Sequence, residues 1–187
     1  MQGYIAAITM VLLITMVIIR SVQLKKFGIK AFKFGEMDKK DFFIPPFALL
    51  LLYIIFSNAF HLPQIGAKMF ENEIIGWVGV IFCFTGLFLF LYSLISFGKS
   101  FRVGIDEDEP GSLITTGAFA LSRNPIYTAF GLVLIGQFLI YPNLLLLIYV
   151  IAGFLLFHRQ IGMEEQSLLK IYGEEYRQYC KKVRRYL

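Results

Sequence analysis

The polar side chains best suited to chemistry lie in two stretches of the chain, residues 98–127 and 159–179. The first stretch contains Arg123, and the second contains the acidic pair Glu164 and Glu165. If these stretches converge, a guanidinium and two carboxylates could line one polar site at the bilayer surface. Each feature also has a simpler interpretation. Arg123 could anchor the end of a membrane span, and the acidic pair could favour the positive end of a helix dipole at a helix start.

Other candidates for metal or redox chemistry are few. The acidic run at residues 106–109 is interpreted as a solvated loop, and we predict no metal site. His61 and His158 have no neighbouring residue that suggests metal ligation. Cys83 lies in an apolar run and Cys180 in a basic tail, so neither is expected to form a disulfide or to bind a metal.

The composition indicates the surroundings in which such a site must work. The chain has 187 residues, of which 57% are hydrophobic and only 17% are charged. A soluble domain carries about 25% charged residues, and a domain this small cannot bury so much apolar surface internally. We therefore predict a single integral membrane domain over residues 1–187. The net charge of +5 is distributed between hydrophobic runs, which argues against nucleic-acid binding.

Apolar runs long enough to cross a bilayer, which takes roughly 20 residues, divide the chain. They cover residues 3–22, 43–60, 75–97 and 125–158. The last run is broken at Pro142 and Asn143, and because Pro interrupts a helix and Asn favours turns, a helical hairpin is expected there. The predicted fold is all-α, with about five transmembrane helices. Three N-terminal spans occupy residues 1–97, and residues 98–187 contain the two stretches that could carry out chemistry.

The tail is predicted to form a further, amphipathic helix on the cytoplasmic side. Apolar residues recur there at helical spacing, namely Leu168, Leu169, Tyr172, Tyr176, Tyr179 and Val183. Charged residues take the other side, a pattern typical of a helix at the membrane interface. We expect a bend at Gly173.

The distribution of positive charge predicts the orientation in the membrane. Of the 18 Lys and Arg residues, 17 fall in residues 20–40, in residues 98–123 and in the tail from residue 159. Only Lys68 falls in a segment that five spans would place outside. The positive-inside rule therefore places the N-terminus outside and the C-terminus in the cytoplasm. No cleavable signal is expected, because no small-residue cleavage site follows the long first run.

Four motifs follow one another in the C-terminal half of the chain. They are Leu113-Ile114-Thr115-Thr116-Gly117-Ala118-Phe119, Arg123-Asn124-Pro125-Ile126-Tyr127, Glu164-Glu165-Gln166-Ser167-Leu168 and Tyr172-Gly173-Glu174-Glu175-Tyr176. In order, spacing and hydrophobic context, residues 98–185 resemble the isoprenylcysteine carboxyl methyltransferase family and the related membrane phospholipid methyltransferases. Two positions depart from the family pattern: Asn124 stands where the family has His, and Gln160 stands where it has Arg.

The resemblance implies S-adenosylmethionine as the cofactor. The expected cofactor contacts are Leu113, Ile114, Phe119, Asn124, Pro125, Ile126, Tyr127 and Glu164, with Asp106 as a looser match. The expected catalytic residues are Arg123, Asn124 and Glu165. The expected substrate contacts are Arg159 and Gln160. Glu164 can accept hydrogen bonds from the cofactor ammonium or ribose hydroxyls, and aromatic residues can face its sulfonium or adenine.

The expected activity is methyl transfer to a lipophilic acceptor, which could be a carboxylate, a thiol or a lipid head group. This reaction needs alignment and desolvation more than other help from the protein. The candidate site contains no His, which favours an acceptor that is already anionic or one deprotonated by a carboxylate such as Glu165. The cofactor would enter from the cytoplasm, and the acceptor would enter from the surrounding membrane lipids.

Two other classes of protein fit part of this pattern. A membrane reductase with a nicotinamide cofactor could share the helical architecture, but the sequence holds no dinucleotide fingerprint. A non-catalytic membrane scaffold or a small transporter also fits the composition, although the spans contain hardly any ionisable residues to mark a transport pathway.

Overall fold

The computed structural model describes residues 1–26, 44–98 and 112–187. Five α-helices account for most of them, namely α1 (Gln2–Lys26), α2 (Ile44–Phe60), α3 (Glu73–Phe97), α4 (Pro125–Ile140) and α5 (Leu144–Lys182). A short 3-10 helix, η3 (Gly117–Ala120), precedes α4. Among the described residues no β-strand occurs, and an isolated β-bridge joins Lys68 to Asn143. The predicted all-α fold is confirmed.

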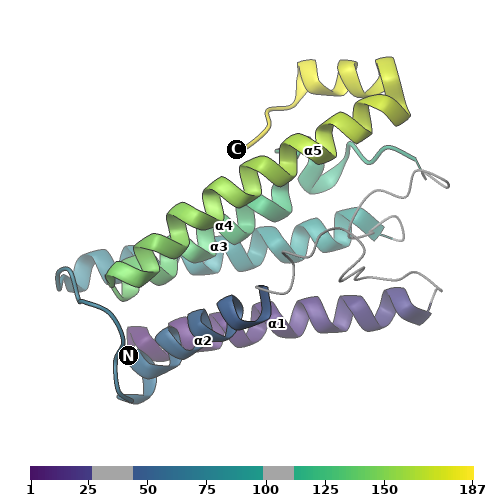
Figure 1. Ribbon diagram of the computed structural model, residues 1–187. Helices are drawn as coiled ribbons and strands as arrows, with labels where there is room; N and C mark the ends of the chain where they lie inside the picture. Colours follow the sequence, from purple (N-terminus) through teal and green to yellow (C-terminus); the bar gives the residue numbers. More distant parts are fainter. Residues whose placement is uncertain (27–43, 99–111) are drawn as a thin grey trace.

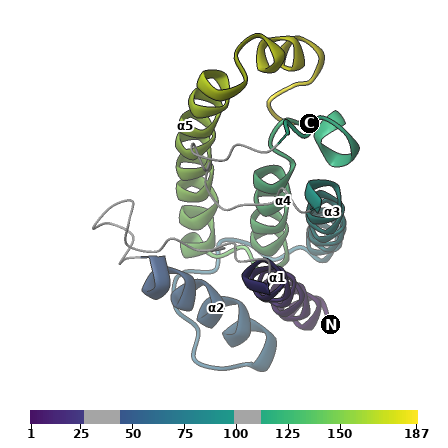
Figure 2. The same cartoon turned by 90° about the vertical axis from the view of Figure 1, so that its right-hand side faces the viewer.

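The helices run alongside one another in two layers (Figure 1, Figure 2). α3, α4 and α5 form one layer, and α1 and α2 pack against it. At the end of the bundle where α3 stops and α4 starts, α5 continues past its neighbours. The C-terminal part of the chain then turns back towards the start of α4 (Figure 2). This arrangement brings the two motif-bearing stretches to the same end of the bundle.

Three helices are long and apolar enough to cross a membrane, judged by length and composition: Gln2–Gln23, Glu73–Phe97 and Leu144–Lys182. Two further apolar helices are shorter, Phe47–Phe60 and Pro125–Ile140. Large apolar side chains remain on the outside, such as Phe88 at 70% exposure and Leu155 at 64%. Contact with lipid accounts for such a surface, which a soluble monomer would not leave bare. Each predicted apolar run is therefore a helix, while the number of spans stays a prediction.

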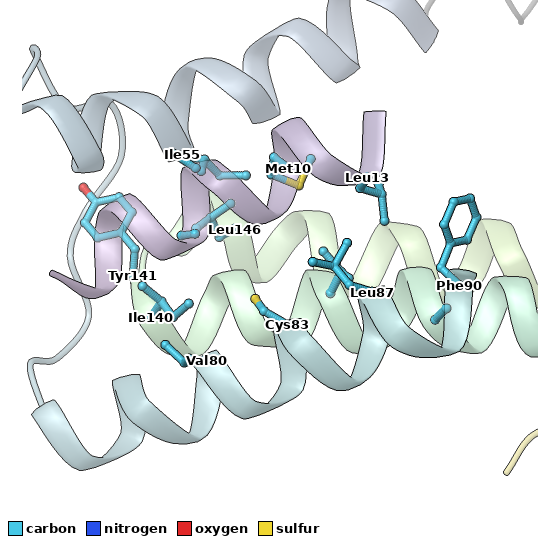
Figure 3. Packing of buried hydrophobic residues seen from close by; sticks show 14 of the residues in the cluster. Met10, Leu13, Ile55, Val80, Cys83, Leu87, Phe90, Ile140, Tyr141 and Leu146 are labelled. Carbon is cyan, nitrogen blue, oxygen red and sulfur yellow. The ribbon is translucent and has the colours of Figure 1, made fainter. Parts of the chain in front are cut away.

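α3 and α4 pack backbone against backbone. A Cβ atom at Gly136 would lie 2.7 Å from both the Cys83 Sγ atom and the carbonyl oxygen of Gly79. Further along the seam, a Cβ atom at Gly86 would lie 2.7 Å from Val133 Cγ2. Small residues at such positions let membrane helices approach closely. Close approach matters in a membrane because van der Waals packing, and not the hydrophobic effect, holds the helices together. Figure 3 shows Cys83 in this part of the core, surrounded by apolar side chains.

The turn between α4 and α5 lies where Pro142 and Asn143 predict it. Asn143 is fully buried. Its side-chain oxygen accepts a hydrogen bond from the Leu145 amide at 2.8 Å, which caps α5. Its side-chain nitrogen donates to the carbonyl oxygen of Ile65 at 3.0 Å. The hairpin turn is therefore tied to the loop between α2 and α3, and the predicted hairpin is confirmed.

The tail is helical and joins the last span without a break before Gly173. α5 continues through the charged region to Gly173, which has φ 51° and ψ −117°, and the chain resumes as helix to Lys182. The expected bend at Gly173 is present, and the interfacial position of the tail stays a prediction. Glu164 and Glu165 thus lie in the middle of α5, because the residues before them include no Pro to end the helix. Their interpretation as helix-start charges is wrong, since the dipole effect fades within the first turn.

Candidate functional site

Glu164 faces the first turn of α4. The Tyr127 hydroxyl donates a hydrogen bond to Glu164 Oε1 at 2.6 Å, and Gln160 Nε2 donates to the same oxygen at 3.1 Å. Among the described residues, no hydrogen bond ends on Glu164 Oε2. The Tyr127 ring also packs against Phe157, with 5.6 Å between the ring centroids. Glu164 therefore keeps one acceptor oxygen beside an aromatic wall.

Glu165 is engaged through both of its oxygens. Oε1 lies 3.2 Å from Arg123 Nη2 and accepts a hydrogen bond from Asn124 Nδ2 at 3.2 Å. Oε2 accepts from Arg185 Nε at 3.0 Å and from Arg185 Nη2 at 2.6 Å. The side chains of Glu165 and Arg123 are only 11% and 13% exposed, whereas that of Arg185 is 39% exposed. Charge-assisted hydrogen bonds of this kind are stronger than neutral ones, so this group joins α4 firmly to α5.

The contact with Glu165 also affects Arg185 itself. Hydrogen bonding to the Glu165 carboxylate raises the pKa of the Arg185 guanidinium above its ordinary value, against a smaller opposing effect of burial. Because arginine is already protonated at any physiological pH, Arg185 stays a permanent cation. The tie between the two residues therefore does not depend on Arg185 gaining or losing a proton.

The C-terminal segment, residues 183–187, returns to the residues that precede α4 (Figure 2). The Arg184 carbonyl oxygen accepts a hydrogen bond from the Arg123 amide at 2.9 Å. The Arg185 carbonyl oxygen accepts from Asn124 Nδ2 and from Ser122 Oγ, each at 3.2 Å. Asn124 is buried, and its side-chain nitrogen is directed at Glu165 and at this segment.

The last turns of α5 also hold η3 in place. The Tyr179 hydroxyl donates to the Phe119 carbonyl oxygen at 2.6 Å. The Phe119 ring packs edge-on against Phe97 at the end of α3, with 4.8 Å between centroids. Gly117 has φ 63°, a left-handed conformation suited to glycine, and the next amide, that of Ala118, donates to Ser96 Oγ at 2.9 Å. η3 is thus fixed between α3 and the C-terminal part of α5.

The structure brings six of the predicted site residues into two adjoining groups: Arg123, Asn124, Tyr127, Gln160, Glu164 and Glu165. Arg123 is more than a possible topology anchor. Its side chain pairs with Glu165 and also donates a hydrogen bond to the Cys180 carbonyl oxygen at 3.4 Å. Asn124, at the start of α4, makes no side-chain cap of that helix. Its amide is used for contacts across to α5 instead.

The remaining predicted residues lie around these groups. Pro125 is buried and Ile126 half-buried in the first turn of α4, while Leu113 and Ile114 are half-buried in the segment that leads into η3. Arg159 is exposed and forms no ion pair within the part of the chain that the structure describes. Asp106 lies outside the described residues.

Sequence reasoning missed the contribution of the C-terminal segment. Arg184 and Arg185 fit the general basic character of the tail, so the sequence pattern indicates only a role in membrane topology for them. Tyr186 likewise gave no sign that its hydroxyl would lie 2.9 Å from His158 Nδ1. A return of the chain after α5 has no signature in hydropathy, because the contacts that stabilise it are long-range and partly made by the backbone.

Known proteins are similar to this chain over the region that contains the candidate site. A family model described as phospholipid methyltransferase matches residues 74–175. A protein-S-isoprenylcysteine O-methyltransferase of Xenopus laevis is 30% identical over 109 residues, which are 57% of this chain and 38% of that protein. A probable protein-S-isoprenylcysteine O-methyltransferase of Oryza sativa subsp. indica is 27% identical over 116 residues, covering 60% of this chain and 61% of that protein. The chain thus spans less than two thirds of the length of these relatives.

A solved structure shows that the fold is shared as well. The eukaryotic intramembrane Ras methyltransferase, an isoprenylcysteine carboxyl methyltransferase, superposes with a TM-score of 0.61 at 20% sequence identity, covering 88% of this chain and 58% of that one. The family match extends over more than half of the chain and includes α3, α4, the Arg123–Tyr127 motif and the Glu164–Glu165 pair. The chain therefore belongs to the phospholipid methyltransferase family.

Proposed function

We propose that this protein transfers a methyl group from S-adenosylmethionine to a lipophilic acceptor at the cytoplasmic face of the membrane. The observation that carries the proposal is the meeting of the first turn of α4 with the middle of α5. There, Tyr127 and Gln160 hold Glu164 by one oxygen. The relatives named above are methyltransferases by name, and the family match covers both halves of this meeting point.

The donor set fits the proposed cofactor. S-adenosylmethionine, when bound, supplies a methyl group on a sulfonium that leaves as a neutral thioether. Its ammonium and ribose hydroxyls need an acceptor, and Glu164 Oε2 is an oxygen without a hydrogen-bond partner among the described residues. The sulfonium and the adenine need aromatic faces, which the Tyr127 and Phe157 rings offer nearby. Glu164 would therefore bind the ammonium or ribose hydroxyls of the cofactor, and Tyr127 would orient the cofactor.

The arrangement also bears on the acceptor. Both oxygens of Glu165 are already occupied by Arg123, Asn124 and Arg185. Neither oxygen is placed to take a proton from an incoming molecule, so Glu165 acts here by holding α4 against α5. An acceptor that arrives as an anion needs no such proton transfer, and it is the class that this geometry supports best. The exposed face of α5, which includes Leu155, offers a route from the bilayer.

The test is a binding titration of the full-length protein in lipid nanodiscs. S-adenosylmethionine and S-adenosylhomocysteine should bind saturably and compete with each other, while NADPH should not bind. Binding of NADPH alone would replace the proposal with a nicotinamide-dependent reductase. Absence of binding by all three compounds would leave a non-catalytic membrane protein and would overturn the proposal.

A further inference from the structure

The C-terminal segment bridges the two helices that carry the proposed cofactor site. The Arg185 side chain is hydrogen-bonded to Glu165 on α5, and the Arg185 carbonyl oxygen accepts from Asn124 at the start of α4. The adjacent Arg184 carbonyl oxygen binds the Arg123 amide. The C-terminal segment therefore contacts α5 through the Arg185 side chain and the start of α4 through the backbone of Arg184 and Arg185.

This bridge lies next to the pair that faces the proposed cofactor. Glu165 follows Glu164 directly on α5, and Tyr127 lies one turn after Asn124 on α4. The 2.6 Å bond between Tyr127 and Glu164 requires a fixed separation of the two helices. Their other ends are joined by the short turn at Asn143, so the separation at this end depends on contacts made across it. Arg123, Asn124 and Arg185 supply part of those contacts through Glu165.

We propose that Arg185 is a positioning residue for the cofactor site: it acts through Glu165 to hold α5 at the distance from α4 that Tyr127 and Glu164 need. The inference rests on the proposed function. Arg185 donates two N–H groups to one carboxylate oxygen, and its loss leaves Glu165 with donors on the other oxygen alone. At 39% exposure, the side chain is not part of the apolar core, so its removal should loosen this end of the bundle without unfolding the protein.

The experiment compares Arg185→Ala, Arg185→Lys, Glu165→Gln and the double variant Arg185→Ala/Glu165→Gln in nanodiscs. Arg185→Ala keeps the backbone carbonyl and removes only the guanidinium. We expect about a tenfold weaker affinity for S-adenosylmethionine. Arg185→Lys should bind S-adenosylmethionine more tightly than Arg185→Ala and less tightly than the wild type. Lysine keeps the positive charge but lacks the paired N–H donors of the guanidinium. The matched control is Arg177→Ala, an exposed arginine paired only loosely with Glu174 at 3.7 Å, and it should bind as the wild type does.

Two further readouts separate this role from others. In the double variant, the loss should be no larger than in Glu165→Gln, because Arg185 acts through Glu165. Additive losses would mean that Arg185 contacts the ligand itself and would overturn the positioning role. In the cofactor-free protein, Arg185→Ala should raise hydrogen exchange at the Arg123 amide about tenfold, since that amide is bonded to the Arg184 carbonyl.

Failure of this inference and failure of the proposed function give different results. Wild-type protein that binds S-adenosylmethionine, with Arg185→Ala binding equally well, overturns the positioning role alone. Wild-type protein that does not bind S-adenosylmethionine overturns the proposed function and the positioning role with it. If Arg185→Ala does not fold, Arg185→Lys carries the test, and an affinity equal to that of the wild type then overturns the inference.

Discussion

Two neighbouring glutamates on α5 meet different partners, because consecutive residues of an α-helix are turned by about 100° around its axis. Glu164 points to Tyr127 and keeps one oxygen without a described partner, whereas Glu165 points to Arg123 and Arg185 and has both oxygens occupied. At the scale of single residues, the acidic pair therefore divides into a group suited to binding and a group suited to holding helices together.

Replacement of Glu164 by Gln should weaken S-adenosylmethionine binding about tenfold or more, because a hydrogen bond to a charged group contributes roughly 1.5–3 kcal/mol. Isothermal titration calorimetry in nanodiscs would measure the effect. The matched control is Glu174→Gln, a glutamate whose side chain is 64% exposed and faces Arg177, and it should bind normally. Equal losses at both positions would show that Glu164 acts only through its negative charge and not through a contact with the cofactor.

Substitutions at Asn124 test whether the second residue of the Arg123–Tyr127 motif acts by hydrogen bonding or as a base. Asn124→Ala should weaken cofactor binding several-fold, because it removes the amide that joins Glu165 to the Arg185 carbonyl. Asn124→His should retain much of the activity and should add no pH dependence near pH 6–7, since imidazole can donate a hydrogen bond without acting as a base. The measurements are cofactor affinity and a pH–rate profile. A new ionisation in the His variant that controls the rate would contradict the hydrogen-bonding role.

The sequence predicted the residues of both groups but not how they are divided. Motif spacing identifies Arg123, Asn124, Glu164 and Glu165, because each lies at a fixed place in a short pattern. The partner of Glu165 on the far side, Arg185, lies outside every motif. Its role depends on a chain reversal after Gly173 that only the three-dimensional structure shows.

At the scale of elements, hydropathy predicted most of what the structure contains. The four apolar runs form five helices, because the break at Pro142 and Asn143 in the last run is the turn between α4 and α5. The helical tail joins the last span without a break before Gly173, and the reason is physical. Residues 159–172 hold strong helix formers and no Pro, so α5 has no cause to stop at the membrane surface. A change from apolar to charged residues marks a change of environment, not the end of a helix.

Gly173 provides a prediction about α5. Its backbone angles, φ 51° and ψ −117°, are costly for any residue with a side chain. Gly173→Ala should lower stability by about 1–3 kcal/mol and should also weaken cofactor binding, because the turn places Tyr179 against Phe119. Thermal unfolding in detergent and cofactor titration would measure the two effects.

The control for this variant is Gly162→Ala, on the regular part of α5. A Cβ atom has no neighbour within 4 Å at either glycine, so the two substitutions differ only in backbone conformation. Alanine is the better helix former by about 1 kcal/mol, and Gly162→Ala should leave stability unchanged or raise it. A Gly173→Ala protein as stable as the wild type would show that the bend is not needed.

At the scale of the whole molecule, the charge distribution predicts orientation. Reporter fusions should place the C-terminus in the cytoplasm and residues near 65 and 142 outside, because 17 of 18 basic residues lie in segments assigned to the inside. The Asn143–Ile65 hydrogen bond shows that these two regions lie together, so they should report the same side. An external C-terminus would place the Glu164 site away from the cytoplasm, where the proposed cofactor is supplied.

The backbone contact between α3 and α4 has a consequence for how the protein moves. Gly79, Cys83 and Gly136 bring α3 and α4 so close that a Cβ atom at either glycine would overlap the other helix, so we expect the two helices to move together. α5 is joined to α4 at the far end by the turn at Asn143. Any ligand exchange that moves α5 away from α3 and α4 must therefore first separate Glu165 from Arg123 and Asn124.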